Sequence, residues 1–188
     1  MTTTPAPASS AAANSTTANS TAQGPRAPSP LLEDERLTRT GLFFEAAMGL
    51  QRALETTLQE RFGISGQHFE ILMRLARSPG QRLRMCDLAM QSAMSPSGLT
   101  RAVDRLVDAG DVTREHCPDD RRVAWARITP DGLDRLEAAI PAALEQIDEL
   151  FLAPLDAAQR EQFDLLMRAV RDHVRPDATQ VSVEAHPA

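Results

Sequence analysis

Two segments of the sequence place hydroxyl and guanidinium side chains at a spacing that suits contacts with a nucleic acid. In the first, Ser95 is a typical helix N-cap and Pro96 a typical first helical residue. Hydroxyl groups bond phosphates or bases, and an arginine bonds guanine through two hydrogen bonds. The helix predicted over 96–109 turns the following polar residues to its outer side: Ser97, Thr100, Arg101, Asp104, Asp108 and, at the edge, Arg105. Gly98 lets the backbone approach a partner closely. An ordinary amphipathic helix with a solvated face shows the same pattern. The helix alone therefore does not indicate DNA binding, and the neighbouring segment is needed to choose between the two interpretations.

The second segment is a polar turn over residues 117–122, flanked by two short runs of β-forming residues at 112–116 and 123–128. This pattern predicts a β-hairpin with Arg121 and Arg122 at its tip. A protruding arginine suits a narrow minor groove. We expect Asp120 to hold one of these guanidinium groups by a charge-assisted pair. Together, the helix and the hairpin favour double-stranded DNA as the partner.

The charge distribution agrees with that partner although the chain is acidic. All 20 basic residues are arginine, and the formal net charge is −6. Residues 81–129 contain eight arginines and seven acidic residues, whereas the remaining residues have a net charge of −7. Only the local field meets the phosphates, so the acidic total does not oppose DNA binding.

Enzymatic and metal chemistry find little support. Because the chain has no lysine, it has neither a Schiff-base amine nor a Walker-type phosphate loop. There is no nucleophile elbow, and the adjacent carboxylates of Asp119 and Asp120 point apart in a turn. The four histidines are scattered without ligand spacing. We therefore expect no enzyme activity, no metal and no cofactor.

The elements that must position these groups follow from periodicity. Residues 85–91 and the helix from 96 are joined by a three-residue turn, which is the helix-turn-helix spacing. Long helices with near-heptad apolar stripes flank this unit, one over 33–62 and others within 130–175. The fold class is therefore mainly α with a small β-hairpin wing. Stripes that the unit cannot cover predict a homodimer.

The ends of the chain differ from its middle. Of the first 30 residues, 26 are Ala, Thr, Ser, Pro or Asn, which predicts a disordered leader rather than a signal peptide. We divide the rest into a folded domain at 31–175, with a DNA-binding lobe at about 65–129, and a flexible tail at 176–188. No apolar run reaches the length of a membrane span, and two cysteines make no disulfide framework. These features predict a cytoplasmic protein.

Residues 81–132 resemble the winged-helix core of the MarR family of bacterial transcription regulators. The family's Thr-Arg pair in the recognition helix matches Thr100-Arg101. Its wing pattern is Asp-x-Arg, five residues, an aliphatic residue and Thr, which here reads Asp120-Arg121-Arg122, five residues, Ile128-Thr129. The resemblance covers about 35–175. It implies an obligate homodimer with a winged helix-turn-helix in each lobe, bound to a pseudo-palindromic operator, commonly as a repressor released by a ligand or by oxidation.

The resemblance also implies an effector pocket between the dimerisation helices and the DNA-binding lobe. Candidate lining residues are Phe43, Phe44, Met48, Phe69 and Met73, which are otherwise plain core residues. Two alternatives stay open: a thiol-redox-responsive regulator and a protein-interaction module on the same fold without DNA binding.

Cys86 is predicted in the first turn of the first helix of the helix-turn-helix. A helix N-terminus favours thiol reactivity, but a small core residue is the simpler interpretation of this cysteine. The peroxide-sensing branch of the family uses a cysteine and tyrosine that this chain lacks.

After Gly110, the family often has Leu-Val where this chain has Asp111-Val112, a departure that we expect to matter little for DNA contact.

Overall fold

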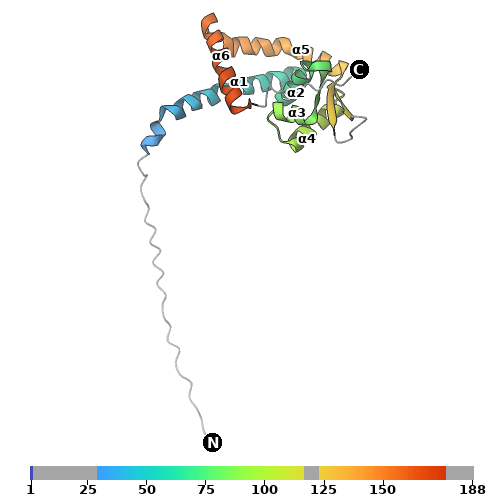
Figure 1. The fold of residues 1–188 in the computed structure, drawn as a ribbon, viewed down its shortest axis with the longest axis horizontal. Helices are drawn as coiled ribbons and strands as arrows, with labels where there is room; N and C mark the ends of the chain where they lie inside the picture. The colour runs from blue at the N-terminus through green and yellow to red at the C-terminus, as the bar shows by residue number, and fades with distance from the viewer. Residues whose placement is uncertain (2–28, 117–122, 177–188) are drawn as a thin grey trace. The chain divides into compact units, whose positions relative to one another are not determined.

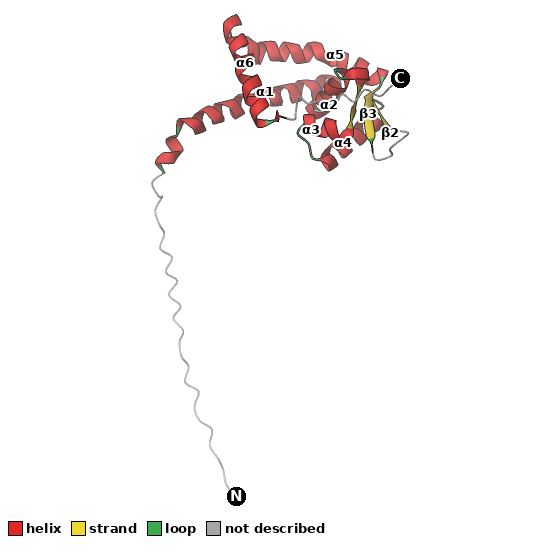
Figure 2. Cartoon of the chain, in the orientation of Figure 1, coloured by secondary structure: helices red, strands yellow, loops and turns green. Residues whose placement is uncertain are grey.

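The computed structural model describes Met1, residues 29–116 and residues 123–176. It divides into two units, Met1–Thr40 and Gly41–Ala188, and the site described below lies in the second. Figures 1 and 2 trace the helices and strands. In chain order they are α1 (Glu35–Phe62), α2 (Gly66–Ala76), β1 (Arg82–Arg84), α3 (Met85–Gln91), α4 (Pro96–Asp108), β2 (Val112–His116), β3 (Ala124–Ile128), α5 (Pro130–Ile147) and α6 (Ala157–Val174).

Side-chain caps begin most of these helices. The Ser95 hydroxyl accepts a hydrogen bond from the Gly98 amide, and the Thr129 hydroxyl accepts one from the Gly132 amide. Asp156 forms a capping box with Gln159 at the start of α6. Each cap satisfies an amide that has no partner within the helix. The helix start predicted at Ser95 is thus confirmed.

A three-stranded antiparallel sheet follows the helix-turn-helix, in the order β1-β3-β2. Leu83 of β1 and Arg114 of β2 both pair with Ala126 of β3. Residues 82–84 form a short strand that adds to the two strands of the hairpin. The sheet therefore anchors the predicted wing to the segment before α3.

The main core lies where α2, α3 and α4 meet the sheet and the first turns of α5. Its fully buried residues include Ile71, Leu72, Leu75, Leu88, Leu99, Val103, Leu106, Val112, Ala126, Ile128 and Leu136. Leu99, Ala102, Val103 and Leu106 form the buried face of α4, whereas Val107 is exposed. A smaller cluster of Leu58, Ile64 and Ala139 packs the end of α1 against α5. Close packing of α4 fixes which of its sides faces outward.

The long flanking helices are hardly buried in the single chain. Leu58 is the one buried residue of α1, and α6 has none within its 18 residues. A π-helical turn, Asp148–Leu152, connects α5 toward α6, where the rings of Phe151 and Phe163 meet edge to face. Exposed apolar residues remain along α1, α5 and α6: Leu42, Phe43, Phe44, Met48, Leu144, Leu166, Val170 and Val174. Across the described parts of the chain, no helix combines the length and apolarity needed to cross a membrane.

Candidate nucleic-acid interface

Helix α4 presents its polar residues on the side away from the core. Its exposed residues, together with the N-cap, are Ser95, Pro96, Ser97, Thr100, Arg101, Asp104, Arg105, Val107 and Asp108. The first four lie at the N-terminal end, where partial positive charge favours an approaching phosphate. The structure therefore brings the predicted helix residues onto one accessible surface.

The first turn of α4 is held by short-range contacts. The Ser95 oxygen lies 3.1 Å from the Gly98 nitrogen and 3.4 Å from the Ser97 hydroxyl. A Cβ at position 98 would lie 3.0 Å from the Ser95 oxygen, so glycine leaves room for the cap as well as for a ligand. The Thr100 hydroxyl donates to the Pro96 carbonyl at 2.9 Å, which leaves its methyl group for apolar contact with a base.

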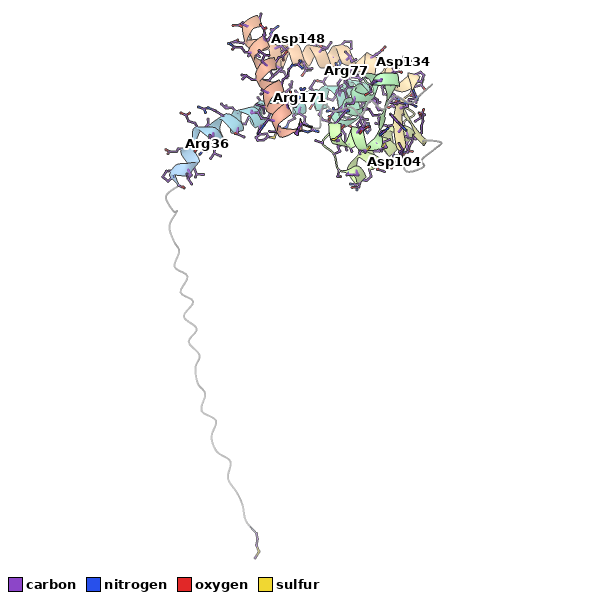
Figure 3. The ribbon with its side chains drawn as sticks, in the orientation of Figure 1. Arg36, Arg77, Asp104, Asp134, Asp148 and Arg171 are labelled. Atoms are coloured by element: carbon purple, nitrogen blue, oxygen red, sulfur yellow. The ribbon has the colours of Figure 1, made fainter. Side chains whose placement is uncertain are left out.

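The two arginines of α4 differ in their partners. Arg105 donates to the Gln67 side chain of α2 at 3.0 Å, so its guanidinium is tied to the protein. Arg101 is exposed and, among the residues that the structure describes, has no hydrogen-bond or ion-pair partner. Asp104, which is labelled on α4 in Figure 3, pairs with Arg114 of β2 at 2.9 Å, and this ion pair joins α4 to the hairpin. Arg101 is therefore the arginine of α4 that is available to a ligand.

The tip of the hairpin, with Cys117, Asp120, Arg121 and Arg122, lies outside the described residues. The sheet below it is braced by charged and aromatic side chains. The centroid of the Trp125 ring lies 4.8 Å from the guanidinium carbon of Arg82 and 5.4 Å from that of Arg84.

A charged pair crosses the same sheet between its second and third strands. Arg127 of β3 donates to Glu115 of β2 at 2.5 Å and to the Gly80 carbonyl at 2.7 Å. This hydrogen bond lowers the pKa of Glu115. The pair therefore stays charged at neutral pH and helps to hold the strands that carry the hairpin tip.

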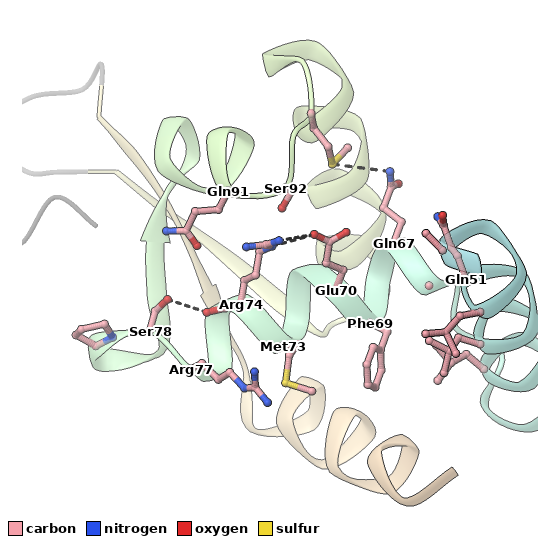
Figure 4. A pocket seen from close by; sticks show the side chains of 17 residues that line it. Gln51, Gln67, Phe69, Glu70, Met73, Arg74, Arg77, Ser78, Gln91 and Ser92 are labelled. Atoms are coloured by element: carbon pink, nitrogen blue, oxygen red, sulfur yellow. Dashed lines mark hydrogen bonds and ion pairs between the residues drawn. The ribbon is translucent and has the colours of Figure 1, made fainter. Parts of the chain in front are cut away.

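A pocket of about 930 Å³ opens between α1, α2 and the turn before α4. Leu50, Leu54, Phe69 and Met73 form its apolar part. From α2, Arg74 and Glu70 form an ion pair at 2.7 Å and point toward Gln91 and Ser92, as Figure 4 shows. The Ser92 hydroxyl is buried, and no residue in the described ranges bonds it. The pocket thus joins apolar walls to polar groups beside the helix-turn-helix.

The structure changes part of the predicted pocket. Phe69 and Met73 line it, as expected, but Phe43, Phe44 and Met48 do not. These three residues lie exposed on α1. The sequence prediction placed them at the pocket because it treated all apolar residues of α1 as one surface. Gln91 and Ser92, which contribute the polar side, carry no periodic signal and were missed.

Cys86 lies at the second residue of α3, as predicted, but its side chain is exposed. The simpler interpretation as a small core residue is therefore wrong. Its sulfur lies 3.7 Å from a carboxylate oxygen of Asp87, to which the thiol donates. Within the described parts of the chain, no three His, Cys, Asp or Glu residues gather as a metal site. His68 is half-buried on α2, and burial, aided by the charge of Arg105, lowers its pKa.

Two arginines that the sequence did not single out connect the flanking helices to the helix-turn-helix. Arg175, just after α6, donates to the carbonyls of Met90 and Gln91 at the end of α3. A cation at this position satisfies free carbonyls and opposes the negative end of the helix. Arg135 of α5 lies beside Asp111, at the end of α4. Both contacts link residues far apart in the sequence, so no local sequence pattern predicts them.

Parts of this chain are similar in sequence to known proteins. Residues 64–124 match the MarR family. The chain is 30% identical over 100 residues to the transcriptional regulator HosA of Escherichia coli O111:H-, a match that covers 53% of this chain and 72% of HosA. It is 29% identical over 110 residues to the transcriptional repressor YetL of Bacillus subtilis strain 168, covering 58% of this chain but only 64% of YetL.

A solved structure with a similar fold is a MarR family transcriptional regulator from Streptomyces coelicolor, crystallised in complex with DNA. It superposes with a TM-score of 0.70 at 30% sequence identity, covering 84% of this chain and 96% of that protein. The match extends beyond the winged helix-turn-helix, so the flanking helices belong to the shared architecture.

Proposed function

The chain belongs to the MarR family of transcriptional regulators, and we propose that it acts as a homodimeric, sequence-specific DNA-binding repressor released by a small molecule. The observation that carries the DNA-binding part is the exposed face of α4. Its N-terminal turn offers hydroxyl groups and a helix end, and Arg101 extends from it without a partner among the described residues. A helix of this kind fits the major groove, with Arg101 toward a guanine edge.

The proposed dimer rests on α1 and α6. An isolated helix of 18 residues gains most of its stability from packing an apolar face. Yet α6 buries no residue, while Leu166, Val170 and Val174 recur along its stripe in exposed positions. A second copy of the chain supplies matching stripes from its own α1 and α6, so a two-fold contact covers both sets at once.

The proposed effector site is the pocket between α1 and α2. Its lining includes Gln91 and Ser92, the last residue of α3 and the first of the turn before α4. A ligand that binds there contacts both a dimerisation helix and the helix-turn-helix. It therefore has the means to favour one orientation of α4 over another, which is the requirement for release.

Replacing Arg101 with alanine tests the DNA-binding proposal. The probe is a fluorescent duplex that the wild-type protein selects from a randomised library. We expect a loss of about 1–3 kcal/mol in binding free energy and a relaxed preference at one base position, because a bidentate contact to guanine disappears. Fluorescence anisotropy gives the affinity, and repeated selection gives the sequence preference.

The matched control for this change is Arg168→Ala, which removes an exposed arginine from α6 instead. It is expected to bind the probe as the wild type does. Equal affinities and sequence preferences for Arg101→Ala and the wild type contradict the assignment of α4. If the folded wild-type protein selects no sequence and shifts no DNA at low salt, the alternative of a protein-interaction module is favoured.

Arg121 and Arg122, at the predicted hairpin tip, are expected to strengthen binding to DNA of any sequence by a similar factor. Changing both Arg121 and Arg122 to alanine removes about two phosphate or minor-groove contacts. We expect weaker binding to selected and unrelated duplexes and a salt dependence that flattens by about 1.8 in the slope of log K against log salt. Titrations at several salt concentrations measure it, and an unchanged slope contradicts the wing assignment.

A further inference from the structure

A buried carboxylate occupies the joint between the recognition helix and α5. Asp111 is 1% exposed, and it stands directly after the αL residue Gly110 that ends α4. The next residue, Val112, is buried in the main core, so the chain places a charge directly beside an apolar core residue. The expectation that an aspartate at this position matters little considered DNA contact alone and overlooked the burial. A buried charge is unfavourable unless it is paired and hydrogen-bonded.

The partners of this carboxylate come from two other helices. The Arg135 Nε atom of α5 lies 3.1 Å from Asp111 Oδ1. The approach has ion-pair distance without the direction of a hydrogen bond, and Oδ1 has no hydrogen-bond partner among the described residues. His68 of α2 and Asp131 of α5 are the other titratable groups that act on Asp111. Because burial lowers the pKa of His68, it adds little positive charge at neutral pH.

The backbone around Asp111 forms a pivot. Its amide donates to the Leu106 carbonyl and its carbonyl accepts from the Thr129 amide, each at 2.9 Å. The Thr129 hydroxyl donates to the Gly110 carbonyl at 2.7 Å. These bonds join the end of α4 to Thr129, the N-cap residue of α5, and Leu136 packs the following turns of α5 into the same core.

Arg135 supplies a polar contact between the same two segments. It lies six residues beyond Thr129 on α5, about 9 Å along the helix axis from the pivot. An attraction at that distance from the pivot resists rotation of α5 against α4. We propose that Asp111 and Arg135 form a positioning pair that fixes the angle between α4 and α5 and thereby sets the separation of the two recognition helices in the dimer. This inference rests on the proposed function.

The energetics favour a positioning role over a stabilising one. Burial raises the pKa of Asp111, and the nearby charges of Arg135 and His68 oppose this rise only in part. The folded state therefore binds the proton more tightly than the unfolded state does. Stability accordingly falls as pH rises from the ordinary carboxyl range through the folded-state pKa, and the penalty is complete above it. Neutralising Asp111 should therefore leave the folded state at least as stable at neutral pH.

The test uses Asp111→Asn, which keeps the shape and removes the charge, and Arg135→Gln, which removes the charge of its partner from a side chain that is 44% exposed. Binding is measured to the selected duplex and to versions with one base pair inserted or deleted between the half-sites. Wild type should discriminate between spacings. Each single variant should lose about fivefold of that discrimination. The double variant should lose no more than a single one, because both changes break one interaction.

Urea unfolding separates positioning from folding. We expect the Asp111→Asn variant to keep at least the wild-type midpoint at neutral pH while its spacing preference weakens. Full wild-type discrimination in a folded Asp111→Asn variant, or additive losses in the double variant, overturn the positioning role. A wild-type protein that selects no sequence, or selects a single half-site, instead contradicts the proposed function, so the two failures are distinct.

Discussion

Replacing Gly132 with alanine is expected to destabilise the folded chain by about 3 kcal/mol or more. A Cβ at this position would lie 2.1 Å from the Asp111 carbonyl oxygen and 2.8 Å from its carbon. The obstacle is backbone, and it is held by the hydrogen bond from the Thr129 amide. Relief of the clash therefore requires α5 to move away from the end of α4. Chemical denaturation with circular dichroism measures the loss.

The matched control is Gly49→Ala on α1. A Cβ there meets no atom within 4 Å, and alanine favours helix over glycine by about 1 kcal/mol. We expect Gly49→Ala to unfold at the wild-type midpoint or above it. If Gly132→Ala and Gly49→Ala unfolded at the same denaturant concentration, the joint between α4 and α5 would be soft, and the pivot described above would not exist.

Helix starts and the helix-turn-helix were predictable because their signals are local. The Ser95 cap reaches an amide three residues away, and Pro96 sets its own backbone angle. The same holds for Thr129 and for the capping box at Asp156. The outer face of α4 then followed from the 3.6-residue period, because its apolar residues had one core to enter. Arg101 thus reached the surface as predicted.

Contacts between residues far apart in the sequence were not predictable from such local signals. Asp111 is buried because α5 passes over the joint, and Arg175 reaches the end of α3 from beyond α6. Neither position has a residue type that local rules explain. The pocket was predicted in part for a related reason. Phe43 and Phe69 are both apolar residues of helices, and periodicity alone does not tell which of them lines the cavity and which stays exposed in the single chain.

Replacing Leu166 with glutamate is expected to convert the proposed dimer into monomers and to weaken operator binding by about 10²- to 10⁴-fold. Leu166 is 63% exposed in the single chain and lies in the stripe of Phe163, Val170 and Val174. A carboxylate in a closed apolar interface loses its water without gaining a partner. A dimer binds its second half-site as an intramolecular step, and a monomer loses that advantage. Analytical ultracentrifugation and anisotropy on the selected duplex measure the two effects.

The adjacent residue provides the control. Leu165→Glu makes the same chemical change on the same helix at 64% exposure. Because successive residues turn by about 100° around the axis, Leu165 falls well outside the stripe. It should leave both the dimer and DNA binding near wild type. Equal dissociation by both variants would mean that α6 meets its partner through another face. Unchanged dimers in Leu166→Glu would mean that α6 lies outside the interface and that α1 alone must cover the partner's apolar residues.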